Sequence, residues 1–146
     1  MSKNLRDFSK TLEEVKKHFK SLLDRGYVID YANPINEQWM VWEVVLKKQN
    51  FCVKLEAERG GLDVSFGSPE HQMKIRALIY LLSKEKEFIG LGSGCLNIFR
   101  NNMGIEAKLL QKHLDRFESS LESEFPKTDE EVQLAEQRWI ARLTGQ

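Results

Sequence analysis

The residue types that most often perform catalysis or bind metals are sparse in this sequence. Its three histidines, His18, His71 and His113, are far apart, and none has a second histidine or a cysteine at the spacing of a metal site. The chain contains no Gly-x-Ser-x-Gly turn, no Walker loop and no His-Glu-x-x-His motif. We therefore expect a protein that is not an enzyme and that has no catalytic, metal or cofactor site. Distant side chains brought together by folding are the remaining route to catalysis.

One glycine-rich stretch, residues 90–94, has the composition of a phosphate-binding loop. Such a loop needs a strand before it and a helix after it. The preceding segment, residues 84–89, has the sequence Lys-Glu-Lys-Glu-Phe-Ile, which is a poor strand, and no Lys-Ser/Thr pair follows. We interpret the stretch as a connection. The alternative function is a small-ligand-binding or enzymatic domain that uses residues 90–104 as a loop over a pocket.

The clearest pattern lies at residues 39–68, which read as three strands separated by two tight turns. Side chains alternate between the two faces of a strand. In each predicted strand one alternating set is apolar. These residues are Met40, Trp42, Val44 and Leu46, then Phe51, Val53, Leu55 and Ala57, then Leu62, Val64 and Phe66. The sequence therefore predicts an antiparallel sheet with one buried face.

Two turns set the predicted register of these strands. We expect Gln49-Asn50 to form the first turn and Gly60-Gly61 the second, where glycine allows the positive φ angles that such turns need. The opposite pairs would be Leu46–Val53, Val44–Leu55 and Trp42–Ala57 across the first turn, and Ala57–Val64 and Leu55–Phe66 across the second. A slip of one residue at either turn would mix the two faces.

The other face of the predicted sheet is mixed and is the candidate surface for binding a partner. Its residues are Val41, Glu43, Val45, Lys47, Cys52, Lys54, Glu56, Glu58 and Asp63. In the predicted register Glu43 opposes Glu56 and Glu58 opposes Asp63, and like charges in opposite positions are mildly unfavourable. The simpler interpretation is a solvated face whose charges relax into water.

The sharper interpretation is a surface kept acidic for a basic partner protein. Four carboxylates, those of Glu43, Glu56, Glu58 and Asp63, would raise the local negative potential and steer such a partner. Lys47 and Lys54 would dilute this field. Val41, Val45 and Cys52 would supply the apolar centre that an interface needs. Self-association into a homodimer is the competing use of that centre.

Helices are predicted on both sides of the sheet in sequence. Leu5, Phe8, Leu12, Val15, Phe19 and Leu22 form one apolar stripe along residues 5–25, and Gly26 fits the stop of that helix. A first strand is predicted at residues 27–32, broken by Asn33-Pro34. Ser68-Pro69-Glu70 has the pattern of a helix start, and that helix would run to about residue 83.

The C-terminal part is predicted to be a helical hairpin over residues 105–146. A stripe of leucines and Phe117 indicates a helix at 105–124, which Phe125-Pro126 would end. Thr128 and Glu131 then have the spacing of a capping box for the last helix. The predicted fold is α+β: an N-terminal helix, a four-stranded antiparallel meander with one buried face, and three following helices, in a single domain of residues 1–146.

Composition limits the classes of partner and the location. The formal net charge is +0, so no overall basic field attracts nucleic acid, which we consider an unlikely partner. The start of the chain has no apolar segment typical of a secretory signal. The longest purely apolar run, residues 77–82, is too short to span a membrane. We therefore expect a cytoplasmic protein, with Cys52 and Cys95 as free thiols rather than a disulfide.

A resemblance adds to this interpretation. The segment Glu58-Arg-Gly-Gly-Leu-Asp-Val-Ser-Phe-Gly-Ser-Pro69 follows a Trp/Phe-rich hairpin and an N-terminal helix. In this it resembles a diffuse group of small bacterial α+β proteins, some of them immunity proteins encoded beside toxins. The resemblance covers residues 5–82 and carries no catalytic residues. It implies a non-enzymatic cytoplasmic protein that binds and occludes a toxin.

Overall fold

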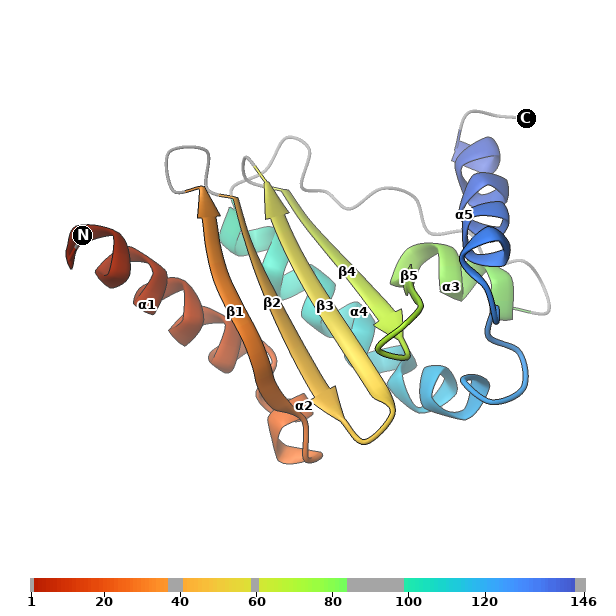
Figure 1. Ribbon diagram of the computed structural model, residues 1–146, viewed down its shortest axis with the longest axis horizontal. Helices are drawn as coiled ribbons and strands as arrows, with labels where there is room; N and C mark the ends of the chain where they lie inside the picture. The colour runs from red at the N-terminus through yellow and green to blue at the C-terminus, as the bar shows by residue number, and fades with distance from the viewer. Residues whose placement is uncertain (1, 37–40, 59–60, 84–98, 144–146) are drawn as a thin grey trace.

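The computed structural model describes residues 2–36, 41–58, 61–83 and 99–143 (Figure 1). In chain order the elements are α1 (Ser2–His18), α2 (Lys20–Asp24), β1 (Val28–Asn36), β2 (Val41–Lys48), β3 (Phe51–Glu58), β4 (Gly61–Gly67), β5 (Gln72–Lys74), α3 (Ile75–Leu82), α4 (Phe99–Ser120) and α5 (Asp129–Leu143). The predicted α+β class, with an N-terminal helix and an antiparallel sheet, is confirmed. Within the described residues the sheet has five strands in the order β1-β2-β3-β4-β5, one more than predicted.

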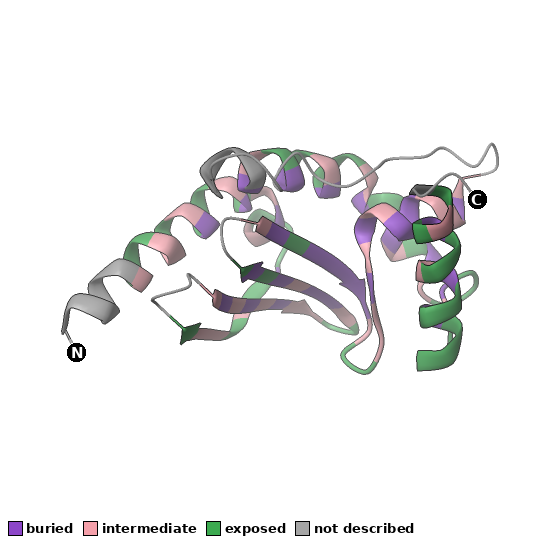
Figure 2. Cartoon of the chain, turned by 90° about the horizontal axis from the view of Figure 1, so that it is seen from above, coloured by how far each residue is buried: buried purple, intermediate pink, exposed green. Residues whose placement is uncertain are grey.

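One face of the sheet is covered by helices. Figure 2 shows α1 and α4 on the same side of the strands, and Figure 1 shows α3 and α5 beside the β5 edge. The core lies between the sheet and these helices. Its largest fully buried side chains include Tyr27, Phe19, Phe66, Phe117, Leu46, Leu55 and Leu110. The side chains of β2, β3 and β4 predicted to point inward are buried wherever the structure describes them, except for the half-buried Phe51.

The register is confirmed at the first hairpin and corrected at the second. Val44 pairs with Leu55 and Trp42 with Ala57, as the Gln49-Asn50 turn predicts. On the next strand, however, Leu55 pairs with Val64 and Ala57 with Leu62. Gly61 is itself a strand residue paired with Glu58, so the predicted Gly60-Gly61 turn is wrong, and residues 59–60 lie outside the described residues. The shift is two residues, and an even shift leaves every side chain on its predicted face.

The N-terminal helical region ends at Gly26, as the sequence predicts. From Phe8 to Leu22 the predicted apolar stripe lies in the core or packs against it, but the helix is interrupted at Phe19, which separates α1 from α2. Gly26 has φ 103°, and the amides of Gly26 and Tyr27 donate to the carbonyls of Leu23 and Leu22 at 3.1 and 3.0 Å. This is the Schellman arrangement that a glycine at this position allows. It directs Tyr27 into the core.

One strand boundary and one helix start are predicted wrongly, each for a local reason. Asn33-Pro34 does not break β1, which continues to Asn36 with an irregular register between Asn33 and Asn36. Proline is tolerated there because β1 is an edge strand, where a missing backbone donor costs no ladder bond. Ser68-Pro69-Glu70 is a turn between β4 and β5 and does not begin a helix.

The serine at this turn makes the bond that a helix cap would make. Ser68 Oγ accepts the His71 amide at 3.1 Å, and the Ser68 amide donates to the His71 carbonyl at 2.9 Å. Ser-Pro sequences suit tight turns as well as helix starts, so the local pattern could not decide between them. The following helix, α3, begins only at Ile75, after β5.

The C-terminal helices differ in length from the prediction, and the capping box predicted for the last of them is present. The helix α4 begins at Phe99 rather than residue 105 and ends at Ser120, whose carbonyl accepts the amides of Glu124 and Phe125 at 2.9 Å. The predicted capping box is present: the Glu131 amide donates to Thr128 Oγ1 at 3.1 Å, and Thr128 donates back to Glu131 at 3.3 Å. The helix α5 packs against α3 and β5.

None of the described helices is both long enough and apolar enough to cross a bilayer.

Candidate functional site

The face of the sheet opposite the helices is the candidate site, and we call it the open face. In the part of the chain that the structure describes, no helix lies over it (Figure 2). Its side chains form rows across the strands, because directly paired residues of neighbouring strands point the same way. One row is Tyr31, Val45, Lys54, Ser65 and Lys74, and the next is Asn33, Glu43, Glu56 and Asp63.

The nine residues predicted for this surface do lie on the open face, but they differ in exposure. Glu56, Glu58 and Asp63 are exposed, and the other members except Cys52 are half-buried. Cys52 is only 3% exposed, which makes it part of the interior in spite of its outward position. It lies opposite Lys47 on β2, and burial raises the pKa of its thiol, while the nearby Lys47 and Lys54 lower it. Cys52 therefore cannot contribute to an apolar centre of an interface.

Apolar surface is instead supplied by the edge strand β1. Val28, Tyr31 and Ile35 are 61%, 46% and 54% exposed, and Val45 lies directly beside Tyr31. Sequence reasoning missed these residues because it ended the strand at residue 32 and assigned no faces to it. The alternation of the segment was weak, and its register with β2 is irregular at two places.

The four carboxylates predicted to cluster line one hollow of about 400 Å³ on the open face, which we call the acidic hollow. The remaining residues around it are Ile35, Val41, Trp42, Ala57, Gly61 and Leu62. The corrected register sharpens the cluster. Glu56 pairs with Glu43 on one side and with Asp63 on the other, so three carboxylates stand in one row across β2, β3 and β4.

The ion pairs of the acidic hollow are long. Lys54 Nζ lies 3.8 Å from Glu43 and 3.9 Å from Glu56, and Lys74 Nζ lies 4.0 Å from Asp63. These separations exceed the roughly 2.7–3.2 Å of a hydrogen bond. The lysines thus offset charge without filling the hydrogen-bonding capacity of the carboxylates. At the other end of the face, Lys47 and Asp30 are closer, at 3.2 Å.

Carboxylates between the layers behave differently. Arg76 donates to Glu106 Oε1 at 2.6 Å, and Glu106 is only 3% exposed. Burial raises the pKa of Glu106, and the hydrogen bond and charge of Arg76 lower it. Tyr27 donates to Glu118 at 2.6 Å, and Arg25 donates to the other oxygen of that carboxylate at 2.7 Å. These groups tie helices together.

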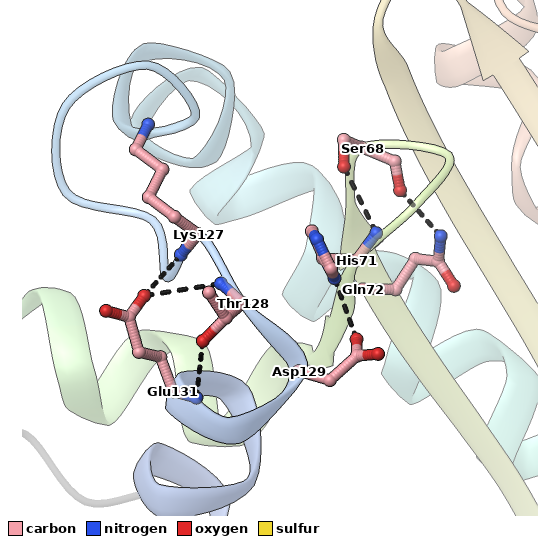
Figure 3. Close-up of polar contacts among 7 residues, drawn as sticks. All are labelled: Ser68, His71, Gln72, Lys127, Thr128, Asp129 and Glu131. Atoms are coloured by element: carbon pink, nitrogen blue, oxygen red, sulfur yellow. Dashed lines mark hydrogen bonds and ion pairs between the residues drawn. The ribbon is translucent and has the colours of Figure 1, made fainter.

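A second, larger hollow of about 780 Å³ lies where three connections meet. It is lined by residues of the β2–β3 turn, the β4–β5 turn and the end of α4, with the segment that follows it. Here His71 Nδ1 lies 2.7 Å from Asp129 Oδ1, at the start of α5 (Figure 3). The Ser68 hydroxyl contacts the backbone of His71 rather than its imidazole (Figure 3). The three residues therefore join the turn to α5 and do not form an activated serine.

The structure does not support the other candidate sites. Among the described residues, no group of three or more histidine, cysteine or acidic side chains is placed to hold a metal. Of the proposed 90–104 loop, residues 90–98 lie outside the described residues, and residues 99–104 belong to α4. No family model, curated protein or solved structure matches the chain.

Proposed function

We propose that this protein is a non-enzymatic binding protein that docks a basic protein partner on its open face. The observation that carries the proposal is a sheet face left uncovered by the described helices, with four carboxylates gathered around one hollow. A bacterial immunity protein that occludes a toxin in the cytoplasm is the form of this function that the sequence resemblance favours.

Charge supports a basic partner over a neutral one. The chain has no net charge, yet the acidic hollow holds four carboxylates against Lys54 and Lys74. Such a local negative potential accelerates the encounter with a positively charged surface. Proteins that cut or grip nucleic acid are basic where they contact phosphate, so they are suitable partners.

The composition of the face also fits an interface. Exposed apolar side chains of β1 lie beside the charged rows, with Tyr31 next to Val45. Interfaces combine aromatic and apolar contacts with a polar rim. A homodimer through this face would bring like charges together, which disfavours self-association compared with binding a basic protein.

The experiment begins with capture of partners from the native cell on the immobilised protein. Binding kinetics of the captured partner are then measured at two salt concentrations for the wild type and for Glu56→Lys/Glu58→Lys. We expect the reversal to slow association at least tenfold at low salt, and the effect to shrink at high salt because exposed charges are screened.

The matched control is Glu13→Lys/Asp24→Lys, which changes the net charge equally on the exposed surfaces of α1 and α2. Equal association rates for the two double variants would remove the open face from the binding site. Sedimentation of the protein alone tests the homodimer: a dimer that the Glu56→Lys/Glu58→Lys variant dissociates would replace the basic partner by a second copy.

A further inference from the structure

The last helix, α5, contributes one narrow stripe of side chains to the core. Among the described residues of α5, the buried side chains are Val132, Ala135 and Trp139, which follow one another at helical spacing. The helix contacts α3 and the edge strand β5 (Figure 1), and most of its other described side chains are exposed. A peripheral helix buried along one stripe opens at a lower free energy than the central strands of a sheet.

Polar contacts also fasten α5 to the β5 end of the sheet. Glu136 Oε2 accepts the amide of Lys74 at 2.9 Å, at the residue where β5 passes into α3. An amide on an edge strand needs an acceptor, and here a helix side chain supplies it. Asp129 Oδ1 lies 2.7 Å from Nδ1 of His71, in the turn that leads into β5. Both contacts break if α5 moves away from the sheet.

The connection before α5 lets the helix move without unfolding. Phe125 is 3% exposed, and its amide donates to the Ser120 carbonyl at 2.9 Å, so this residue stays with α4. The capping box of α5 joins Thr128 and Glu131 and lies entirely on the other side of Pro126. The helix therefore carries its own N-terminal cap, and the short segment between Phe125 and Thr128 is where the chain can bend.

A buried ion pair lies under the middle of this helix. Trp139, which is 2% exposed, borders a cavity of about 40 Å³ together with Arg76 and Glu106. Arg76 donates to Glu106 Oε1 through Nε at 3.1 Å and through Nη2 at 2.6 Å. The side chains of Arg76 and Glu106 are 12% and 5% exposed. The indole ring of Trp139 is therefore part of the wall that separates this pair from water.

We infer that α5 is a hinged cover over the ion pair of Arg76 and Glu106, and that it opens as a unit while the sheet stays folded. Opening exposes the stripe of Val132, Ala135 and Trp139 and lets water reach the pair. Unfolding of the sheet would in addition expose the core between the strands and α4, which costs far more. The cover requires no partner and is independent of the proposed docking face.

The test is native-state hydrogen exchange of the isotope-labelled full chain at several urea concentrations below the unfolding transition. After correction for intrinsic rates, the amides of Ala135 and Trp139 should exchange at least about tenfold faster than those in the middle of β3. Their exchange should also depend less on urea, because opening exposes less surface than global unfolding. The Nε–H of Arg76, which Glu106 accepts, should follow α5 and not β3.

Glu136→Ala removes the acceptor of the Lys74 amide and should speed exchange in α5 and at the Arg76 Nε–H by about threefold to tenfold. The amides of β3 should keep their rates, which also verifies that the variant is folded. Glu130→Ala is the matched control, because it removes the same charge from an exposed position of α5. Glu130 lies in the first turn, where a carboxylate favours the helix, so the control already includes any loss of helix stability.

Several results would overturn the cover. Equal rates and equal urea dependence for α5 and β3 would show that α5 opens only when the whole protein unfolds. Rates that rise steadily toward the C-terminus of α5 would mean fraying and not opening as a unit. An Arg76 Nε–H that follows β3 would mean that α5 does not seal the ion pair. Equal effects of Glu136→Ala and Glu130→Ala would remove the contact with Lys74 from the closure.

Discussion

Carboxylates on the two sides of the sheet are paired at different distances, closely beside the helices and loosely in the acidic hollow. On the side of the helices, carboxylates such as Glu106 and Glu118 are held by hydrogen bonds of 2.6–2.7 Å. On the open face, the charges of the acidic hollow stay 3.8–4.0 Å apart. A buried charge must be paired closely because desolvation is expensive, whereas an exposed charge is already solvated. Because helices cover only one face of the sheet, buried charges that stabilise the fold lie on one side and exposed, hydrated charges lie on the other.

The largest expected effect comes from breaking the buried pair. Arg76→Met removes the partner of Glu106, which is 3% exposed. Loss of one member of a buried pair typically costs about 3–5 kcal/mol, because the other charge is left without compensation. Urea unfolding at pH 7 measures the change in the free energy of unfolding.

The pH dependence of this variant gives a sharper result. Burial raises the pKa of Glu106, and Arg76 counteracts that rise, so the pKa rises further in Arg76→Met. A carboxyl whose pKa is higher in the folded than in the unfolded state stabilises the fold when protonated, and that stability is lost as the pH rises through the folded pKa. The variant should therefore recover stability on acidification relative to Arg76→Met/Glu106→Gln. Parallel pH profiles for the two would contradict a buried, uncompensated Glu106.

A core truncation compares the two faces at neighbouring positions of one strand. Leu55 is fully buried between Val44 and Val64, and Leu55→Ala should cost about 2–5 kcal/mol. Lys54, the preceding residue, points to the open face, and Lys54→Ala should change stability by no more than roughly 0.5 kcal/mol. Urea midpoints decide the matter, and similar shifts for both variants would show that the faces are wrongly assigned.

Two glycines of the same strand test the corrected register. A Cβ at Gly67 would overlap the carbonyl oxygen of His71 and lie 2.8 Å from the Phe125 ring, so Gly67→Ala should cost about 1–3 kcal/mol. Among the described residues, the nearest atom to a Cβ at Gly61 is the Glu58 carbonyl oxygen at 3.4 Å, and Gly61 has no positive φ. Thermal unfolding of Gly61→Ala should therefore resemble that of the wild type. A large loss at Gly61 would favour the glycine turn that the sequence predicts.

These pairs of positions show how far sequence reasoning reaches. Alternation with a period of two assigns faces, and faces survive a register shift of two, so the inward side of β2–β4 was predicted correctly although the second hairpin was not. The site depends on the same parity, which is why the four carboxylates were identified. Features outside that pattern were missed. Strand β1 continues through Pro34 because it lies at the edge of the sheet, and β5 forms because the chain turns back at Ser68.

The exposure of a side chain and the length of an ion pair depend on neighbours that are distant in the sequence or have long side chains. The sequence does not show these contacts directly. Cys52 points outward but is buried beside Lys47 and Lys54. His71 has no metal ligand at a recognisable spacing, yet it contacts Asp129, which is 58 residues later in the chain. Only the folded arrangement of turns and helices brings such groups together.

The smallest expected effect concerns the charges of the acidic row. Glu56 has a carboxylate on each side, Glu43 and Asp63, and one shared lysine at 3.9 Å. Like charges in opposite positions destabilise a sheet by tenths of a kcal/mol, and two such contacts outweigh a long ion pair. Glu56→Gln should therefore stabilise the fold by roughly 0.2–0.5 kcal/mol at low salt. The gain should vanish near 1 M salt, where screening acts over about 3 Å.

Glu13→Gln is the matched control for this substitution, because Glu13 is exposed on α1 among Lys10, Lys16 and Lys17 and should lose stability slightly on neutralisation. If Glu56→Gln raises the free energy of unfolding and Glu13→Gln lowers it, the fold tolerates charge repulsion in the acidic row. A surface selected only for stability would relieve that repulsion. A loss of stability in Glu56→Gln that salt does not change would mean that Glu56 is held by specific contacts. In that case the carboxylates of the acidic row would be bonded as closely as those on the helix-covered side. The two faces would then differ only in how exposed their carboxylates are.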